Sequence, residues 1–143
     1  MRHITQQGID LIKYFEGFSS DVYICPAGYP TIGYGHLVRD SESFDQISMS
    51  KAEELLRKDV EVAERAVSRL INTPLTDSQF DALVSFTYNL GSGALQRSTL
   101  RRIVNRAEHG RVPEQLMRWV WAGGRKLKGL ITRRRAETRL YFA

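Results

Sequence analysis

One short segment of the sequence has the composition of β-strands, and it lies within a chain that is otherwise patterned as helices. Between Asp21 and Val38, Tyr, Val, Ile and Thr residues are interrupted by Pro and Gly, which is typical of short strands joined by tight turns. Before and after this segment, apolar residues recur at helical spacing. The sequence therefore predicts an α+β fold, with a small antiparallel sheet near the N-terminus and a ligand cleft between sheet and helices.

The helices on either side of the predicted sheet have recognisable ends. The first is expected from Thr5 to about Glu16, because Gly17 follows as a stop signal. Ser50 and Glu53 have the spacing of a capping box, which predicts a long linking helix over about 51–71. We expect this single helix to join a sheet lobe to a helical lobe.

The second half of the chain is predicted to be helical. Thr76 and Gln79 form another capping box, and the helix that they begin should end at Gly91. Further helices are expected over about 99–108, 113–121 and 130–142. The resulting hypothesis is a single domain, 1–143, with a sheet lobe over about 18–48 and a helical lobe over 1–17 and about 72–143.

The cysteine content and the N-terminal sequence suggest where the chain is made. Cys25 is the only cysteine, so no intrachain disulfide can form. The first 18 residues include Gln6, Gln7, Asp10 and Lys13, which interrupt any apolar run of the length of a signal peptide or membrane span. We therefore expect synthesis in a cytoplasm without an export signal.

The chain is basic, with a formal net charge of +5 and a pI near 9.6. An anionic partner suits this charge, and nucleic acid, lipid headgroups and the bacterial envelope all qualify. Much of the excess lies in the last third, at Arg125, Lys126, Lys128 and the run Arg133–Arg135. This run is either a solvated helix face or a binding patch, and composition does not choose between them.

Glu16 is the first candidate for chemistry. It stands in the sequence Phe-Glu-Gly-Phe, where the first helix ends and the sheet begins. Neighbouring aromatic side chains displace water, which disfavours the ionised carboxyl, and a general acid needs the protonated form. Taken alone, a glutamate at a helix end is more often a solvated or capping residue. The sequence that follows changes this balance.

Several motifs downstream of Glu16 together resemble one enzyme family. Cys25 follows Glu16 by nine residues, Thr31 follows six residues later, and Thr31 begins the sequence Thr-Ile-Gly-Tyr-Gly-His. Further motifs lie at 86–91, 98–100, 119–124 and 129–137, so that nearly the whole chain is covered. The chain is similar to the phage-type lysozymes, glycoside hydrolase family 24. The resemblance implies a lysozyme-like fold and hydrolysis of the β-1,4 bond between N-acetylmuramic acid and N-acetylglucosamine in peptidoglycan.

The resemblance also implies a catalytic set made of Glu16, Cys25 and Thr31. Glycoside hydrolysis commonly needs an acid for the leaving oxygen, here Glu16, and a second group that guides water or stabilises the transition state. The Thr31 hydroxyl can hold the attacking water. Three roles stay open for Cys25: a thiolate base or nucleophile, a neutral thiol that positions water, or an inert residue beside a working Asp21. Cysteine-protease signatures are absent.

Other residues are expected to support or line the site. Asp59 lies in the apolar stripe of its predicted helix and therefore needs a partner. The family pairs a histidine after the Gly-x-Gly with an acid at this point, which predicts a structural pair of His36 and Asp59. The substrate-binding residues implied by the resemblance are Gly35, Leu37, Tyr88, Asn89 and Thr99.

The resemblance implies peptidoglycan strands as the substrate and a separate holin that gives access to the wall. The charge of the basic C-terminal third suggests anionic envelope lipids as a further partner. We expect a monomer with no metal or cofactor, since His3, His36 and His109 are too scattered for a metal site. Two alternatives without hydrolase activity are a DNA-binding module and a cationic protein that disrupts the envelope.

Overall fold

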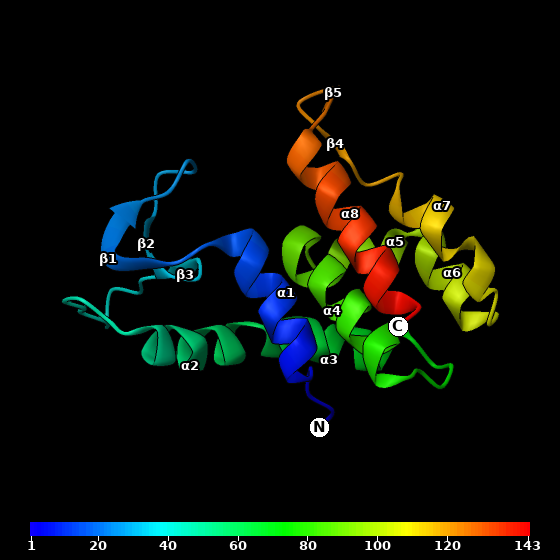
Figure 1. Ribbon diagram of the computed structural model, residues 1–143, viewed down its shortest axis with the longest axis horizontal. Coiled ribbons are helices and arrows are strands. Elements are labelled where there is room, and N and C mark those ends of the chain that lie inside the picture. The colour runs from blue at the N-terminus through cyan, green and yellow to red at the C-terminus, as the bar shows by residue number, and fades with distance from the viewer. The chain divides into compact units, whose positions relative to one another are not determined.

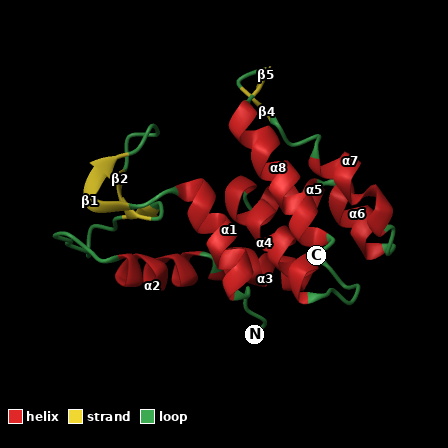
Figure 2. Ribbon diagram, viewed as in Figure 1, coloured by secondary structure: helices red, strands yellow, loops and turns green.

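The computed structural model describes residues 1–143 and divides into two compact units. One unit, called the sheet unit below, is Ile12–Glu61; the other, the helical unit, combines Met1–Leu11 with Val62–Ala143. Strands are few and short, and most of the chain is helical (Figures 1 and 2). The predicted α+β class with a small antiparallel sheet is confirmed.

The sheet unit is built on a three-stranded antiparallel sheet in the order β1-β2-β3. Its strands are β1 Ser19–Ile24, β2 Pro30–Gly33 and β3 His36–Leu37. Thr31 in the middle strand pairs with Tyr23 on one side and with Leu37 on the other. Helix α2, Met49–Asp59, packs against β2 and β3. At Gly33, which has φ +65°, a Cβ would lie 3.0 Å from the Ala52 Cβ, so the absence of a side chain allows this close packing.

Two expectations about the linking helix were wrong. The N-cap of α2 is Ser48, whose side chain accepts a hydrogen bond from the Lys51 N–H, and the expected capping box at Ser50 is not used. The helix also ends at Asp59, and a separate helix α3, Glu61–Leu70, follows. The interruption is at Val60, where ψ is −11°, about 30° from the helical value. Val60 is fully buried and the preceding Asp59 side chain is bonded to His36 of β3, and we attribute the turn to these two anchors.

The helical unit is organised around α4, Asp77–Leu90, which packs against α8, Lys128–Tyr141 (Figure 1). The predicted capping box of Thr76 and Gln79 is confirmed, as is the helix end at Gly91, which has φ +95°. The side chains of α4 from residue 80 to residue 87 are all buried. Helix α1, Gln6–Glu16, begins in this unit and ends in the sheet unit.

Shorter elements complete the helical unit: α5 Ser92–Arg97, α6 Thr99–Asn105, the 3-10 turn η1 His109–Arg111, α7 Val112–Leu116, and the strands β4 Trp121–Ala122 and β5 Arg125–Lys126. The helix expected over 113–121 was therefore too long. Gly123 and Gly124 both have positive φ, which suits the two-residue turn of a β-hairpin, and Trp121 lies in a strand. None of the helices is both long and apolar enough to span a membrane.

Candidate active site

Glu16 is the last residue of α1, and its carboxyl lies against the turn between β2 and β3. Gly17 ends the helix with φ +72° and donates its N–H to the Lys13 carbonyl at 3.0 Å. A Cβ placed on Gly35 would lie 3.2 Å from Glu16 Oε1, and Gly35 itself has φ +85°. The predicted substrate-binding residue Gly35 is therefore a neighbour of the predicted acid. Any side chain at Gly35 would crowd the carboxyl as well as strain the backbone.

Cys25 lies in the turn between β1 and β2, where backbone N–H groups surround its thiol. The Cys25 N–H donates to the Tyr29 carbonyl at 2.9 Å, and the Gly28 N–H donates to the Cys25 carbonyl at 2.8 Å. Both backbone groups of Cys25 are therefore hydrogen-bonded within the turn. The backbone N–H of Tyr29 is the strongest influence on the thiol and lowers its pKa. Burial acts in the opposite direction, and the Thr31 hydroxyl and the N–H groups of Ala27 and Gly28 lower the pKa further. The net result is a thiol with a pKa below its ordinary value.

Thr31 is the neighbour of Cys25 on β2, and its hydroxyl has two uses for one hydrogen. The side chain is 2% exposed, and its hydroxyl donates to the Tyr29 carbonyl at 3.0 Å. The same hydroxyl contributes to the lowered pKa of the Cys25 thiol. A hydroxyl carries a single hydrogen, so it can donate to the Tyr29 carbonyl or to the sulfur, but not to both at once.

His36 lies between two carboxylates. Its Nδ1 is 2.8 Å from Asp59 Oδ2, so the two residues expected to pair are hydrogen-bonded, and its Nε2 is 3.0 Å from Glu42 Oε1. Only a doubly protonated ring can donate to both carboxylates. Burial alone disfavours the charged ring, but the bonds to Asp59 and Glu42 outweigh it and raise the pKa of His36. The Arg39 N–H donates to Glu42 at 2.8 Å and, with His36, lowers the pKa of Glu42.

Asn89 lies near the end of α4 and is bonded to a buried arginine. Arg134 Nη2 donates to Asn89 Oδ1 at 2.6 Å, which leaves the Asn89 amino group as its available donor. Arg134 and Glu137 of α8 are both completely buried, with Nε and Oε1 2.8 Å apart. These two atoms are not aligned as a hydrogen bond, so the attraction there is Coulombic. Glu137 also accepts from Ser85 Oγ at 2.7 Å.

The buried positions of two arginines correct an expectation about the basic C-terminal third. Arg133 is 4% exposed and Arg134 is 0% exposed, so the run Arg133–Arg135 is neither a solvated face nor a binding patch as a whole. Both guanidinium groups are required as partners of Glu137. Arg135 remains exposed, as do Arg125, Lys126 and Lys128.

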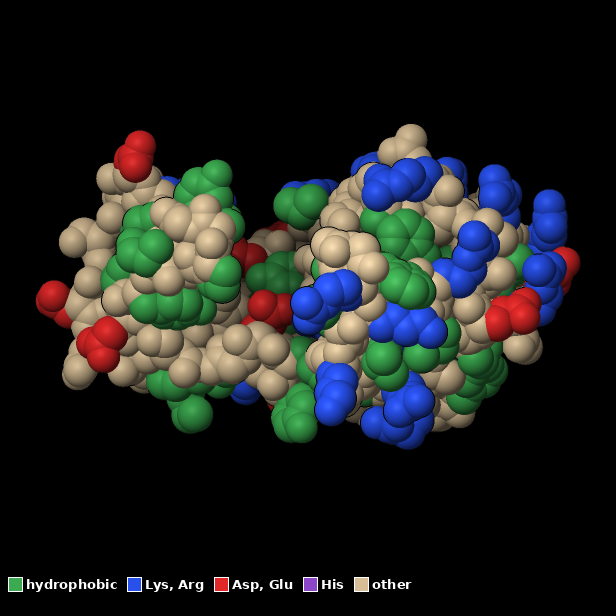
Figure 3. Space-filling model, turned by 90° about the horizontal axis from the view of Figure 1, so that it is seen from above, with side chains coloured by type: hydrophobic (Ala, Val, Ile, Leu, Met, Phe, Trp, Pro, Cys, Tyr) green, Lys and Arg blue, Asp and Glu red, His purple; other side chains and the backbone are tan.

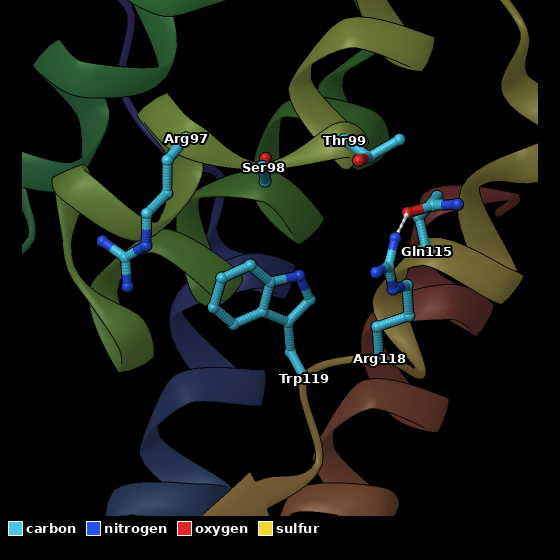
Figure 4. A pocket seen from close by; sticks show the side chains of 6 residues that line it. All are labelled: Arg97, Ser98, Thr99, Gln115, Arg118 and Trp119. Carbon is cyan, nitrogen blue, oxygen red and sulfur yellow. Dashed lines mark hydrogen bonds between the residues drawn. The ribbon is translucent and has the colours of Figure 1, made fainter.

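Thr99, the first residue of α6, lines a pocket of about 220 Å³ with the Trp119 ring (Figure 4). Arg97, Ser98, Gln115 and Arg118 complete the wall, and Arg118 donates to Gln115 at 3.4 Å. The Trp119 ring packs edge-on against Phe86 of α4 with 5.6 Å between centroids, which fixes its position. An aromatic wall beside polar donors is the kind of surface that sugars contact.

The remaining candidate residues, Leu37, Tyr88 and Asp21, differ in how exposed they are. Leu37 of β3 is 55% exposed, and Tyr88 of α4 is partly buried. Asp21, the alternative carboxylate to Cys25, is an exposed residue of β1 whose Oδ2 accepts from the Ser20 hydroxyl at 3.2 Å. The sheet unit thus contains Glu16, Cys25 and Thr31, and the helical unit contains Tyr88, Asn89 and Thr99.

Two partners were missed by the sequence reasoning. Glu42 was not considered for His36 because it lies in an irregular loop, where periodicity says nothing about orientation. Glu137 was not considered as the reason for Arg133 and Arg134, although its i+4 and i+3 spacing places it on their side of a helix.

The fold is that of a lysozyme-like α+β protein. A sequence model described as phage lysozyme matches residues 13–137, and the chain belongs to this family, so the family predicted from the sequence is confirmed. The endolysin of Bacillus phage B103 is 43% identical over 142 residues, which cover 98% of this chain and 54% of that protein. The chain therefore spans about half the length of this relative.

Two solved structures resemble the chain over its full length. The muramidase domain of SpmX from Asticaccaulis excentricus is 36% identical, with a TM-score of 0.89, and 99% of each chain is covered. A mutant of P22 lysozyme is 33% identical, with a TM-score of 0.91, and all of both chains is covered. Both structures have the lysozyme-like fold that the family model predicts for this chain.

Proposed function

We propose that the protein is an endolysin that hydrolyses the β-1,4 bond between N-acetylmuramic acid and N-acetylglucosamine in peptidoglycan. The observation that carries this proposal is the occurrence, in one compact unit, of the Glu16 carboxyl against Gly35 and of the Cys25 thiol with a lowered pKa. Membership of the phage lysozyme family and the similarity to a muramidase domain support the same reaction.

In this mechanism Glu16 donates a proton to the glycosidic oxygen as the bond from the anomeric carbon to that oxygen breaks. The Cys25 thiolate accepts a proton from a water molecule whose oxygen forms the new bond to the anomeric carbon. The Thr31 hydroxyl donates to the thiolate and helps to hold the water. One proton thus leaves Glu16 and one proton reaches Cys25 in each reaction. Base catalysis by Cys25 in a single displacement inverts the anomeric configuration.

The helical unit supplies contacts to the sugar rings in this proposal. The Asn89 amino group, which Arg134 leaves available, suits the carbonyl of an acetamido group, and the pocket of Thr99 and Trp119 suits a ring face. Gly35 and Leu37 contribute from the sheet unit, and Tyr88 lies beside Asn89. The protein is then made in the host cytoplasm, reaches the wall after a holin opens the inner membrane, and acts as a monomer without a metal or cofactor.

The test is clearing of purified peptidoglycan by the wild type and four variants across pH. Glu16→Gln should lose nearly all activity, since general acid catalysis contributes about 10²–10⁴-fold. Thr31→Ala should lose part of the activity, and Cys25→Asp should retain a substantial part, because a carboxylate can also act as the base. Thermal unfolding of each variant shows whether activity is lost through the catalytic step or through loss of the folded protein. Full activity of Cys25→Ser would make the thiol a spectator.

The stereochemistry of the product separates the two active roles of Cys25. Base catalysis predicts the inverted anomer, and the retained anomer would instead indicate a covalent thioglycoside intermediate. NMR of freshly formed product from a defined glycan distinguishes them.

Neither alternative without hydrolase activity is favoured. The family is that of lysozymes, and the buried Arg133 and Arg134 leave the C-terminal helix with fewer surface charges than its sequence suggested. Undiminished lysis of permeabilised cells by Glu16→Gln would reverse this conclusion.

A further inference from the structure

A segment of the helical unit carries arginines without any carboxylate. From residue 82 to residue 107 the sequence contains no Asp or Glu, and its four charged residues are Arg97, Arg101, Arg102 and Arg106. None of these four forms an ion pair with an acidic side chain, whereas Arg111 on the following turn has two. Four guanidinium groups near each other without a counter-charge repel one another, and this repulsion is relieved by an external anion.

The same four residues line a single pocket of about 440 Å³, which we call the arginine pocket. Its other walls are polar side chains, among them Asn72 and Asn105, and no aromatic or acidic residue contributes. The arginines come from the end of α5, from α6 and from the residue that caps α6. A ligand in this pocket meets N–H donors from several directions.

Part of the arginine pocket is held in place before any ligand arrives. Arg101 is partly buried, and it donates from Nε to the Leu70 carbonyl at 3.0 Å and from Nη1 to the Gln96 carbonyl at 3.2 Å. Asn105 donates to the same Leu70 carbonyl at 3.0 Å and accepts from the Asn72 N–H at 2.8 Å. These bonds leave Arg101 Nη2 with its hydrogens available. Fixed donors reduce the entropy lost on binding.

The net charge of the helical unit also favours the binding of an anion in the arginine pocket. The helical unit has 16 basic and seven acidic residues, a formal net charge of +9, whereas the sheet unit has five basic and nine acidic residues, a formal net charge of −4. Figure 3 shows many Lys and Arg side chains on the visible face of the helical unit and few on that of the sheet unit. The helical unit therefore attracts anions, and the arginine pocket is a place on it where they can be bonded.

We propose that the arginine pocket binds the phosphate groups of a flexible phosphodiester polymer of the bacterial wall. A phosphate offers oxygens in tetrahedral directions, and the arginine pocket presents guanidinium groups from α5, from α6 and from the residue that caps α6. The choice of a wall polymer rests on the proposed function. Such contacts would hold the enzyme on the wall between cleavage events.

Nucleic acid offers the same phosphodiester chemistry but fits the pocket less well. Proteins that bind single strands combine charge with aromatic side chains on which bases stack, and the arginine pocket has no aromatic wall. A duplex is read by a helix or strand placed in a groove, whereas the arginines here surround a hollow.

The experiment measures binding of labelled poly(glycerol phosphate) to the full chain by fluorescence anisotropy at several salt concentrations. Arg102→Gln/Arg106→Gln removes two exposed charges from the arginine pocket, and Arg125→Gln/Lys126→Gln removes two exposed charges from the β4–β5 hairpin as a matched control. The pocket variant should bind about tenfold more weakly, because charge-assisted contacts to phosphate are lost. The control should stay within about twofold of the wild type.

Each other outcome overturns the proposal. An equal loss in both variants would mean unspecific attraction by net charge. Competition by inorganic phosphate as strong as by the polymer would mean a site for a single ion, and tighter binding of polyglutamate or of duplex DNA of equal charge would mean another ligand class. If the double variant does not fold, Arg106→Gln with Arg125→Gln as its control gives the same comparison. Poly(glycerol phosphate) has no β-1,4 glycosidic bond, so the binding assay does not depend on hydrolysis. A failure of the arginine pocket proposal can therefore be told apart from a failure of the proposed function.

Discussion

Each unit of the molecule contains a cluster of charged side chains, and the two clusters differ in how they are neutralised. In the sheet unit, the histidine cluster consists of His36, Asp59 and Glu42, whose two carboxylate side chains are 21% and 24% exposed. In the helical unit, the arginine–glutamate cluster consists of Arg133, Arg134 and Glu137, and the last two are completely buried.

The two clusters differ in whether their cations, histidine in one and arginine in the other, can lose a proton at ordinary pH. Histidine can lose its proton within the physiological pH range, so the attraction within the cluster of His36 depends on pH, and water reaches both carboxylates. Arginine stays protonated at ordinary pH, so the two cations of its cluster keep their charge through mild changes of pH. We expect the first cluster to adjust stability by small amounts, and the second to be costly to disrupt.

Replacement of Glu137 by Gln should have the largest effect. Burial raises the pKa of the Glu137 carboxyl, and the guanidinium groups of Arg134 and Arg133 oppose this. Glu137→Gln leaves those two cations buried without a counter-charge, which we expect to lower the free energy of unfolding by about 3–5 kcal/mol. Urea unfolding at pH 7 measures the loss.

A matched control separates burial from charge. Glu114 of α7 forms an ion pair with Arg111 at 3.2 Å, but its side chain is 62% exposed. Glu114→Gln removes the same charge and should change stability by less than about 1 kcal/mol. Similar losses for Glu114→Gln and Glu137→Gln would contradict the distinction between the two clusters.

Asp59→Asn should have the second largest effect. Burial raises the pKa of Asp59 by more than the bond from His36 lowers it, so desolvation offsets the gain from the ion pair. Asparagine removes the charge and that cost together, and Glu42 still bonds His36. We expect a loss of about 1–2 kcal/mol at pH 6 and a lower pKa of His36. NMR titration of the ring follows the pKa, and an unchanged titration would disprove the coupling.

The regular features of this fold could be predicted from the sequence, because each has a local cause. The Thr76–Gln79 capping box acts over four residues, and the sheet segment is marked by its own prolines and glycines. The hydrogen bond between His36 and Asp59 joins residues far apart in the chain, but a charged residue in an apolar stripe indicated that Asp59 needs a partner.

Other features depend on tertiary contacts that no local pattern contains. The interruption of the linking helix at Val60 has no glycine or proline to mark it, and the burial of Arg134 contradicts the usual exposure of arginine. The arginine pocket was overlooked because its residues are spread over two short helices. The absence of any carboxylate from 82 to 107 was the available signal.

The pH dependence of stability should show a component from His36. Burial lowers the pKa of the ring, but Asp59 and Glu42 together raise it by more, so that the folded value lies above the ordinary one of 6.5. The stabilisation is complete below about pH 6.5 and is lost as the pH rises through the folded-state pKa. Thermal unfolding of the wild type from pH 5 to 9 should show this decline. In His36→Gln the component should be absent, and an unchanged profile would assign it to another group.

Glu42→Gln should have the smallest effect. The pKa of Glu42 is lowered mainly by the Arg39 N–H and then by His36, and glutamine keeps an oxygen that can accept both bonds. The loss at pH 6 should therefore be less than about 1 kcal/mol. Because the pKa is lowered, the contribution of Glu42 is present above its ordinary pKa of 4.5 and is lost as the pH falls through the folded-state value. Unfolding curves of Glu42→Gln and wild type should converge in acid, where a constant difference would show that the charge of Glu42 has no part in the histidine cluster.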